Sequence, residues 1–177
     1  MAVKSTKNQY GSAVVIFHWL TALLILSLIP LGIFMHEQTN VAIKAGLFKA
    51  HIAIGLTVFI VTIARLIWKH KDSKVADLTK TPKIQRLMSK SIRHLSITVL
   101  LLIPISGLTY IISSGLAAQL IFAESINWPS PGDYATATAH WVLAILLVAL
   151  LILHIAEAVY HQFFIKDAIF ERIWFKK

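Results

Sequence analysis

Histidines are the residues of this sequence best suited to chemistry. The chain of 177 residues contains eight histidines and no cysteine. Without cysteine it cannot form a disulfide, a thiolate-bound iron–sulfur cluster or a thioether-attached haem. Imidazole is therefore the metal-binding nitrogen group that is present in quantity. The chemistry open to the chain depends on which histidines the fold brings together.

Four apolar stretches determine where these histidines lie. Hydrophobic residues make up 57% of the chain and charged residues only 14%, far less charge than a soluble domain carries. The stretches cover about residues 13–35, 51–68, 95–113 and 137–161, and each is close to the ~20 residues that a helix needs to cross a bilayer. We therefore predict an all-α fold, a four-transmembrane-helix bundle that forms a single membrane domain over residues 1–177.

The positive charges are concentrated in one connection and at the two termini. The segment 69–93 carries eight lysines and arginines against two aspartates, whereas the other two connections carry few charges. Lysine and arginine accumulate on the cytoplasmic side of membrane proteins, so we predict that both termini and this basic loop face the cytoplasm. The net charge of +9 then reflects topology and contact with anionic lipid headgroups, and it does not indicate nucleic-acid binding.

With this topology, four histidines fall at two matched depths. His18 on the first span and His154 on the fourth lie toward the cytoplasmic side, whereas His51 on the second and His140 on the fourth lie near the periplasmic side. His140 and His154 are fourteen residues apart, which places them nearly on one helix face and ~21 Å apart along the axis. Two histidines at one depth can supply both axial ligands of a haem iron between their helices, so the spacing predicts a di-haem core. Gly55, one turn from His51, would let a flat macrocycle approach the helix.

Other interpretations of these histidines remain open. A single histidine within a membrane is often only a hydrogen-bond partner for a neighbouring helix. Zinc is a rival metal, but it prefers three or four ligands at one point, and two separated pairs suit haem better. A proton-conducting or metal-handling membrane protein would use the histidines directly, without haem.

Short motifs occur along the chain in an order that is more specific than any one of them. They are Tyr10-Gly11, Phe17-His18-Trp19, Ala50-His51 followed by Gly55, Arg65-Leu66, Arg93-His94-Leu95, Pro104-Ile105-Ser106-Gly107, His140-Trp141, Leu153-His154, Tyr160-His161 and Lys166-Asp167. Through them the chain resembles, over nearly its whole length, the bacterial cytochrome b561 family, which is grouped with the b-type cytochrome subunits of nickel hydrogenases.

The resemblance implies a set of roles for the histidines. In that family four histidines ligate two b haems, and the matching positions here are His18 with His154 and His51 with His140. His161 matches a histidine associated with quinone on the cytoplasmic side. The resemblance thus implies a cytochrome that carries electrons across the membrane between a periplasmic-side donor and the quinone pool. Two alternatives stay open: a superoxide:quinone oxidoreductase, because at least one branch oxidises superoxide, and a cytochrome b anchor subunit of a hydrogenase or dehydrogenase.

The chain departs from the family pattern at three places. Gln162 follows His161 where many relatives have a second histidine. Glu157 stands where relatives tend to have a small apolar residue. The connection 115–136 matches no pattern of the family.

Five further residues are candidates for roles near a haem or a quinone. His94 either hydrogen-bonds a haem propionate or a quinone carbonyl or anchors its helix at the interface, and Arg65 either pairs with a propionate or reaches to the headgroups. We expect Glu157 to pair with Arg65 rather than to relay a proton to quinone. Lys44 and Lys49 lie in the periplasmic connections, where cations could steer superoxide, although ordinary solvated lysines are the simpler expectation.

Overall fold

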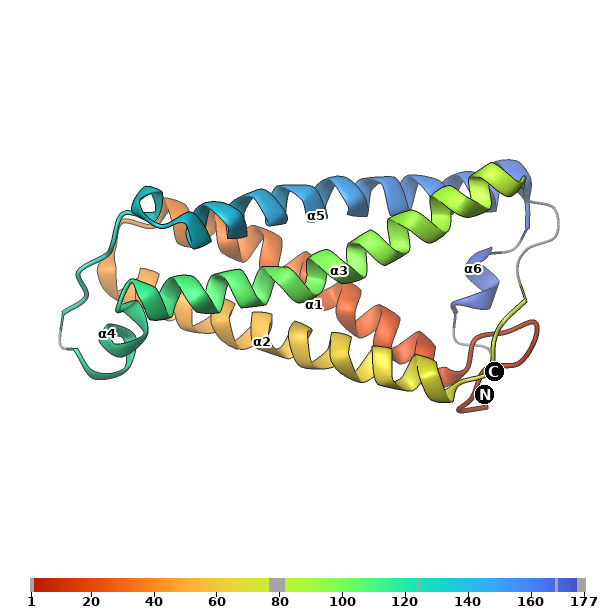
Figure 1. Cartoon of the computed structure of the whole chain (residues 1–177), viewed down its shortest axis with the longest axis horizontal. Coiled ribbons are helices and arrows are strands. Elements are labelled where there is room, and N and C mark those ends of the chain that lie inside the picture. The colour runs from red at the N-terminus through yellow and green to blue at the C-terminus, as the bar shows by residue number, and fades with distance from the viewer. Residues whose placement is uncertain (1, 77–81, 124, 168, 175–177) are drawn as a thin grey trace.

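The computed structural model describes residues 2–76, 82–123, 125–167 and 169–174 (Figure 1). Within these residues it is all-α, as predicted, with four helices long and apolar enough to cross a membrane and no strand. The long helices are α1 (Ser12–Glu37), α2 (Val41–Lys71), α3 (Lys83–Ser113) and α5 (Ala135–Tyr160), and α5 continues into the π-helical turn η2 (His161–Ile165). The short elements are α4 (Leu116–Phe122), the 3-10 turn η1 (Pro131–Asp133) and α6 (Ile169–Arg172).

Two of the long helices extend well beyond their predicted spans. The helix α2 begins at Val41, where the Asn40 side chain accepts a hydrogen bond from the amide of Ile43 and caps the helix. The helix α3 begins at Lys83, so much of the basic segment 69–93 is helical rather than loop. Hydropathy locates the uninterrupted apolar part of a helix, and it does not register further turns that contain lysines or arginines, as the first turns of α2 and α3 do.

The helices pack as two hairpins. Along the described chain, α1 packs against α2 and α3 packs against α5, and a contact between α2 and α3 joins the two pairs. A small buried cluster of Ile25, Val58 and Leu100 lies where α1, α2 and α3 meet, with Leu147 and Leu151 of α5 packed against it. The bundle is therefore held at its centre by interdigitated aliphatic side chains.

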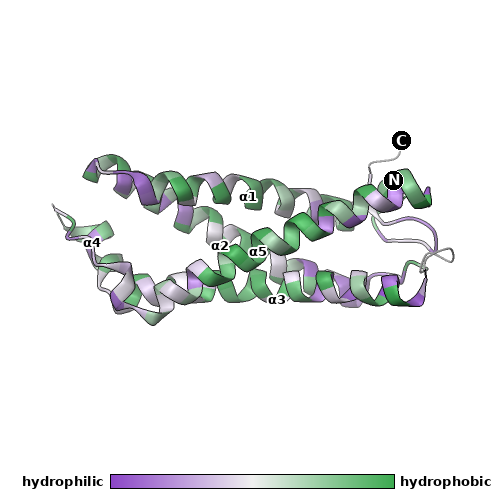
Figure 2. Ribbon diagram, turned by 90° about the horizontal axis from the view of Figure 1, so that it is seen from above, coloured by the Kyte–Doolittle hydropathy of each residue, from purple (hydrophilic) through white to green (hydrophobic). Residues whose placement is uncertain are grey.

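Most of the apolar surface lies on the outside of the bundle. Leu23, Ile60 and Ile152, in the middle of three different helices, are 64%, 65% and 62% exposed. Figure 2 shows hydrophobic residues along the long helices, and hydrophilic residues concentrated toward both ends. A continuous apolar exterior of this kind requires lipid as its solvent.

Three basic segments meet at one end of the bundle. The amide and hydroxyl of Ser5 donate to the Asp72 carboxylate at 2.8 and 2.5 Å, which ties the N-terminal segment to the end of α2. The Arg172 guanidinium donates to the carbonyl oxygens of Asn8 and Ala76, which ties in the C-terminal segment. The described N-terminal and C-terminal segments and the end of α2 thus share one end of the bundle, visible in Figure 1. That this end faces the cytoplasm stays a prediction.

The orientation can be tested by cysteine labelling, because the natural chain has no cysteine to interfere. Lys4→Cys and Ser130→Cys place one thiol at an exposed position at each end of the bundle. In intact bacterial cells we expect a membrane-impermeant maleimide to label Ser130→Cys, and to label Lys4→Cys only after lysis. The cysteine-free parent is the control, and the reverse labelling pattern would overturn the predicted orientation.

Candidate functional site

The imidazole rings of His18 and His154 face each other across the bundle. His18 lies on α1 and His154 on α5, and their ring centroids are 6.2 Å apart with the planes inclined by 59°. Arg65 of α2 is close enough to interact electrostatically with both rings. These two histidines, which the sequence placed at one depth, therefore meet near the end that carries the termini.

A second pair of imidazoles lies at the other level of the bundle. His51 of α2 and His140 of α5 also have ring centroids 6.2 Å apart, with the planes inclined by 67°. The Nδ1 atom of His51 is buried and has no hydrogen-bond partner within the described chain. The helix α5 therefore supplies one member of each pair, and α1 and α2 supply the others.

The spacing of the rings suits one iron between each pair. A metal–imidazole bond is about 2 Å long and a ring nitrogen lies about 1.1 Å from its centroid, so two rings on opposite sides of one metal have centroids ~6 Å apart. Neither α1 nor α2 packs closely against α5 in the described part of the chain. Each ring pair thus bridges two helices whose backbones stand apart, which is the arrangement that a flat macrocycle between them needs.

The orientation of His140 is fixed by α3. Its Nδ1 lies 2.9 Å from the Ile103 carbonyl oxygen and 3.3 Å from the Ser106 hydroxyl. A carbonyl only accepts, so Nδ1 carries the proton and Nε2 is left with its lone pair. A partner of this kind on the outer nitrogen orients a metal-binding histidine and selects its tautomer.

Two glycines allow close packing against the histidines of this level. A Cβ added at Gly107 would lie 2.9 Å from both Cε1 and Nδ1 of His140, a distance that forces something to move. A Cβ added at Gly32 would lie 3.4 Å from Cε1 of His51. Beside Gly55, by contrast, an added Cβ would meet no described atom within 4 Å.

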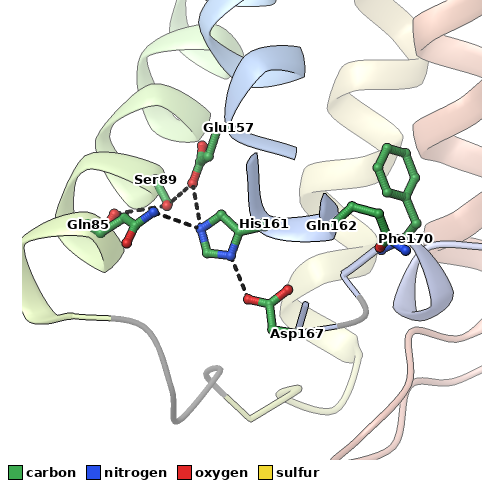
Figure 3. A network of polar contacts seen from close by, with 7 residues as sticks. All are labelled: Gln85, Ser89, Glu157, His161, Gln162, Asp167 and Phe170. Atoms are coloured by element: carbon green, nitrogen blue, oxygen red, sulfur yellow. Dashed lines mark hydrogen bonds and ion pairs between the residues drawn. The ribbon is translucent and has the colours of Figure 1, made fainter. Parts of the chain in front are cut away.

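A polar network occupies the end of α5 that lies nearest the termini (Figure 3). His161 is buried, and its Nδ1 lies 2.5 Å from Oδ2 of Asp167. Its Nε2 lies 3.4 Å from Nε2 of Gln85 and 4.0 Å from Oε1 of Glu157. The Ser89 hydroxyl donates to the same Glu157 oxygen. Side chains from α3, α5 and the segment after η2 thus meet around one imidazole.

The backbone after α5 makes this network possible. Residues 161–165 form a π-helical turn, and Lys166 then adopts a left-handed φ of 55°. A π-helical turn is rare, and a left-handed φ is uncommon for a residue other than glycine. Both tend to occur at functional sites. Together they reverse the chain, so that Asp167 reaches the ring of His161.

With this geometry established, comparison with known proteins identifies the family. A family model described as prokaryotic cytochrome b561 matches residues 9–176. The protein named cytochrome b561 homolog 2 from Escherichia coli (strain K12) is 26% identical, in an alignment covering 98% of this chain and 95% of the relative. The chain belongs to the prokaryotic cytochrome b561 family. It is therefore a multi-pass membrane protein of a b-type haem family that transfers electrons.

One expectation about this cytochrome is wrong. We predicted that Glu157 pairs with Arg65, but its partners are Ser89 and His161. The physical reason is that Glu157 projects toward α3, whereas Arg65 of α2 lies near the His18 and His154 rings. Arg65 therefore remains a candidate partner for a haem propionate, and Glu157 does not occupy it.

The remaining candidates lie outside the ring pairs and the network. His94 is exposed, and its Nδ1 lies 2.6 Å from the Lys90 carbonyl oxygen of its own helix. Lys44 lies over the Trp128 ring, with its Nζ 5.3 Å from the centroid, and Lys49 is exposed. The two lysines thus lie on α2 between its start and His51, seven and two residues before that histidine, and the contact of His94 is within its own helix.

Several members of the site were not predicted from the sequence. The Ser106 hydroxyl that contacts His140 lies in the motif Pro104-Ile105-Ser106-Gly107, and the Ile103 carbonyl lies just before it, but neither position indicates its target in the sequence. Asp167 was also a motif residue, and its contact with His161 depends on the turn between them. Gln85 and Ser89 lie on α3, within the segment 69–93 that the charge pattern predicts to be a loop.

The packing of Gly107 on His140 generates a test. We expect Gly107→Ala to displace the imidazole and to lower the haem content of the purified protein, because an over-packed contact costs about 1–3 kcal/mol. The measurement is the ratio of haem to protein from a pyridine haemochromogen assay. Gly46→Ala is the matched control, since an added Cβ there meets no described atom within 4 Å. Equal haem content in both variants would contradict this role for Gly107.

Proposed function

We propose that this cytochrome holds two b haems per chain and carries electrons across the bacterial inner membrane, between a periplasmic-side donor and the quinone pool. His18 and His154 would ligate one iron, and His51 and His140 the other. The observation that carries the proposal is the pair of 6.2 Å centroid separations at two levels of α5. The family membership supports b haem as the group that the rings hold.

The surroundings of the rings suit this role. When bound, haem supplies one-electron chemistry at an iron that cycles between the ferric and ferrous states. The two levels of α5 are ~21 Å apart along the helix, which spans most of the hydrocarbon layer. Arg65 lies near the His18–His154 level, where a cation can pair with a propionate in low dielectric.

The proposed quinone site lies at the end that carries the termini. The resemblance to the family associates His161 with quinone, and here His161 is a buried imidazole among polar side chains. A quinone carbonyl needs hydrogen-bond donors that are kept away from bulk water, and this network contains several. His94 is exposed and stays a weaker candidate for the same role.

Two substitutions test the assignment of ligands. We expect His51→Ala and His18→Ala each to lose about half of the haem, because each removes one of the two axial ligands of one iron. The measurement combines the haem-to-protein ratio with the reduced-minus-oxidised optical spectrum, which should differ between the two variants. His36→Ala changes an exposed histidine outside both pairs and should retain the full haem content. A full complement of haem in either test variant would contradict the assignment.

Superoxide is the candidate donor that a specific observation favours. Lys44 and Lys49 place two cations on the first turns of α2, on the side of the His51–His140 pair away from the termini, and the Trp128 ring contacts Lys44. A fixed cation beside a redox centre raises the local concentration of a small anion.

This candidate has its own measurement. On stopped-flow mixing with superoxide we expect rapid reduction of the haems, slowed several-fold by Lys44→Gln with Lys49→Gln and slowed also by added salt. Lys7→Gln, at the opposite end, is the control and should react like the unchanged protein. If the haems stay oxidised, or if the rate ignores both salt and the two lysines, superoxide is not the donor.

A further inference from the structure

Three groups that can exchange protons gather at the end of α5, outside both ring pairs. They are the carboxyls of Glu157 and Asp167 and the imidazole of His161, whose side chains are 16%, 2% and 3% exposed. Charged groups are costly to bury in a membrane protein, and they are usually there for a function. Neither ring pair uses them, and His161 lies seven residues beyond His154, or ~10 Å along the helix.

The contacts determine which nitrogen of His161 can exchange a proton with Glu157. Asp167 accepts from Nδ1 of His161 at 2.5 Å, so Nδ1 carries a proton and Nε2 is the nitrogen that gains or loses one. Nε2 is 4.0 Å from Oε1 of Glu157, a gap that a rotation of the carboxyl or one bridging water closes. The other oxygen of Asp167, Oδ1, is buried without a partner in the described chain and is open to a donor from outside it.

Among the described residues, one charged side chain of α3 faces this cluster, together with uncharged partners from the same helix. Arg93 of α3 interacts electrostatically with Glu157 and also with His154. Ser89 and Gln85, also of α3, contribute uncharged partners on the same side. The cluster therefore contains two carboxyls and one imidazole beside one arginine, which is a combination that can hold and release a proton.

We propose that His161 and Glu157, with Asp167 as their positioning residue, form a proton relay that delivers protons from the terminus-bearing side of the membrane to a quinone reduced there. This inference rests on the proposed quinone-reducing function. Each quinone takes up two electrons from the reduced cytochrome and two protons to become the hydroquinone. Glu157 donates a proton to the reduced quinone and regains one from Nε2 of His161. His161 regains its proton at Nε2 from water on the solvent side, and Asp167 holds the imidazole with its proton on Nδ1, the tautomer that the transfer requires.

The relay is tested on the haem-loaded, full-length protein. The reduced cytochrome is mixed with a short-chain ubiquinone analogue, and its reoxidation is followed optically across the pH range in which histidine and carboxyl groups titrate. Ferricyanide, which accepts an electron without a proton, serves as the second oxidant. The variants are Glu157→Gln, Glu157→Asp and Asp167→Asn, and Glu37→Gln changes an exposed carboxyl at the opposite end as the control.

We expect Glu157→Gln to slow reoxidation by the quinone roughly tenfold or more and to flatten its pH dependence, as the loss of a general acid does. Glu157→Asp should recover part of the rate, and ferricyanide should oxidise every variant as fast as the unchanged protein. Asp167→Asn should alter the pH profile, because it removes the group that fixes the His161 tautomer. Glu37→Gln should behave like the unchanged protein with both oxidants.

A second readout does not depend on electron transfer. An infrared pH titration should show a carboxyl band that Glu157→Gln removes and that Asp167→Asn shifts along the pH axis. An unshifted band in Asp167→Asn would overturn the coupling between these groups.

The possible failures can be told apart. If Glu157→Gln leaves the quinone reaction unchanged, the relay is overturned and the proposed function stands. If it slows quinone and ferricyanide equally, the cluster only supports the fold, and the relay is again overturned. If the unchanged protein does not reduce quinone at all, the proposed function itself fails and the relay falls with it.

Discussion

The helix α5 presents two imidazoles, fourteen residues apart, to two different partners, and the rest of the bundle is arranged around this requirement. His140 faces α2 and His154 faces α1, each with a centroid separation of 6.2 Å. The two rings at each level stand between the helices and keep α5 apart from α1 and α2. The helix α5 packs instead along α3. The central aliphatic cluster around Ile25, Val58 and Leu100 then holds the two hairpins together between the two levels.

Several hydroxyl groups inside the apolar layer form hydrogen bonds within their own helix. The hydroxyls of Thr21, Thr62 and Ser96 each donate to the carbonyl four residues earlier in their own helix. The polar contacts that cross between helices concentrate near the histidines, at Ile103 with His140 and at Ser89 with Glu157. An unsatisfied polar group is costly in lipid. The polar contacts between helices therefore indicate where polar side chains serve the histidines rather than only their own helix.

The sequence predicted the fold class and the four histidines that meet, because hydropathy and helical spacing are local properties. Length and apolar composition located the spans, and the topology placed His18 at the depth of His154 and His51 at that of His140. The extra turns at the start of α2 and α3 escaped prediction because lysines or arginines interrupt the apolar pattern in both. The contact of Asp167 with His161 depends on a π-helical turn and on the left-handed conformation of Lys166, and no local sequence pattern predicts either. The orientation of Glu157 depends on how α5 is rotated against α3, which is a tertiary property.

The sharing of α5 between both pairs has a mechanical consequence. If each pair grips one iron, the separation of the two metals is set by covalent geometry along a single continuous helix, since both ligands from that side are attached to it. Movement of α1 or α2 would tilt one ring, but it would change the distance between the two metals only slightly. The rate of electron transfer falls steeply with the distance between the two metals. It would therefore depend little on movements of α1 and α2 or on the composition of the surrounding lipid.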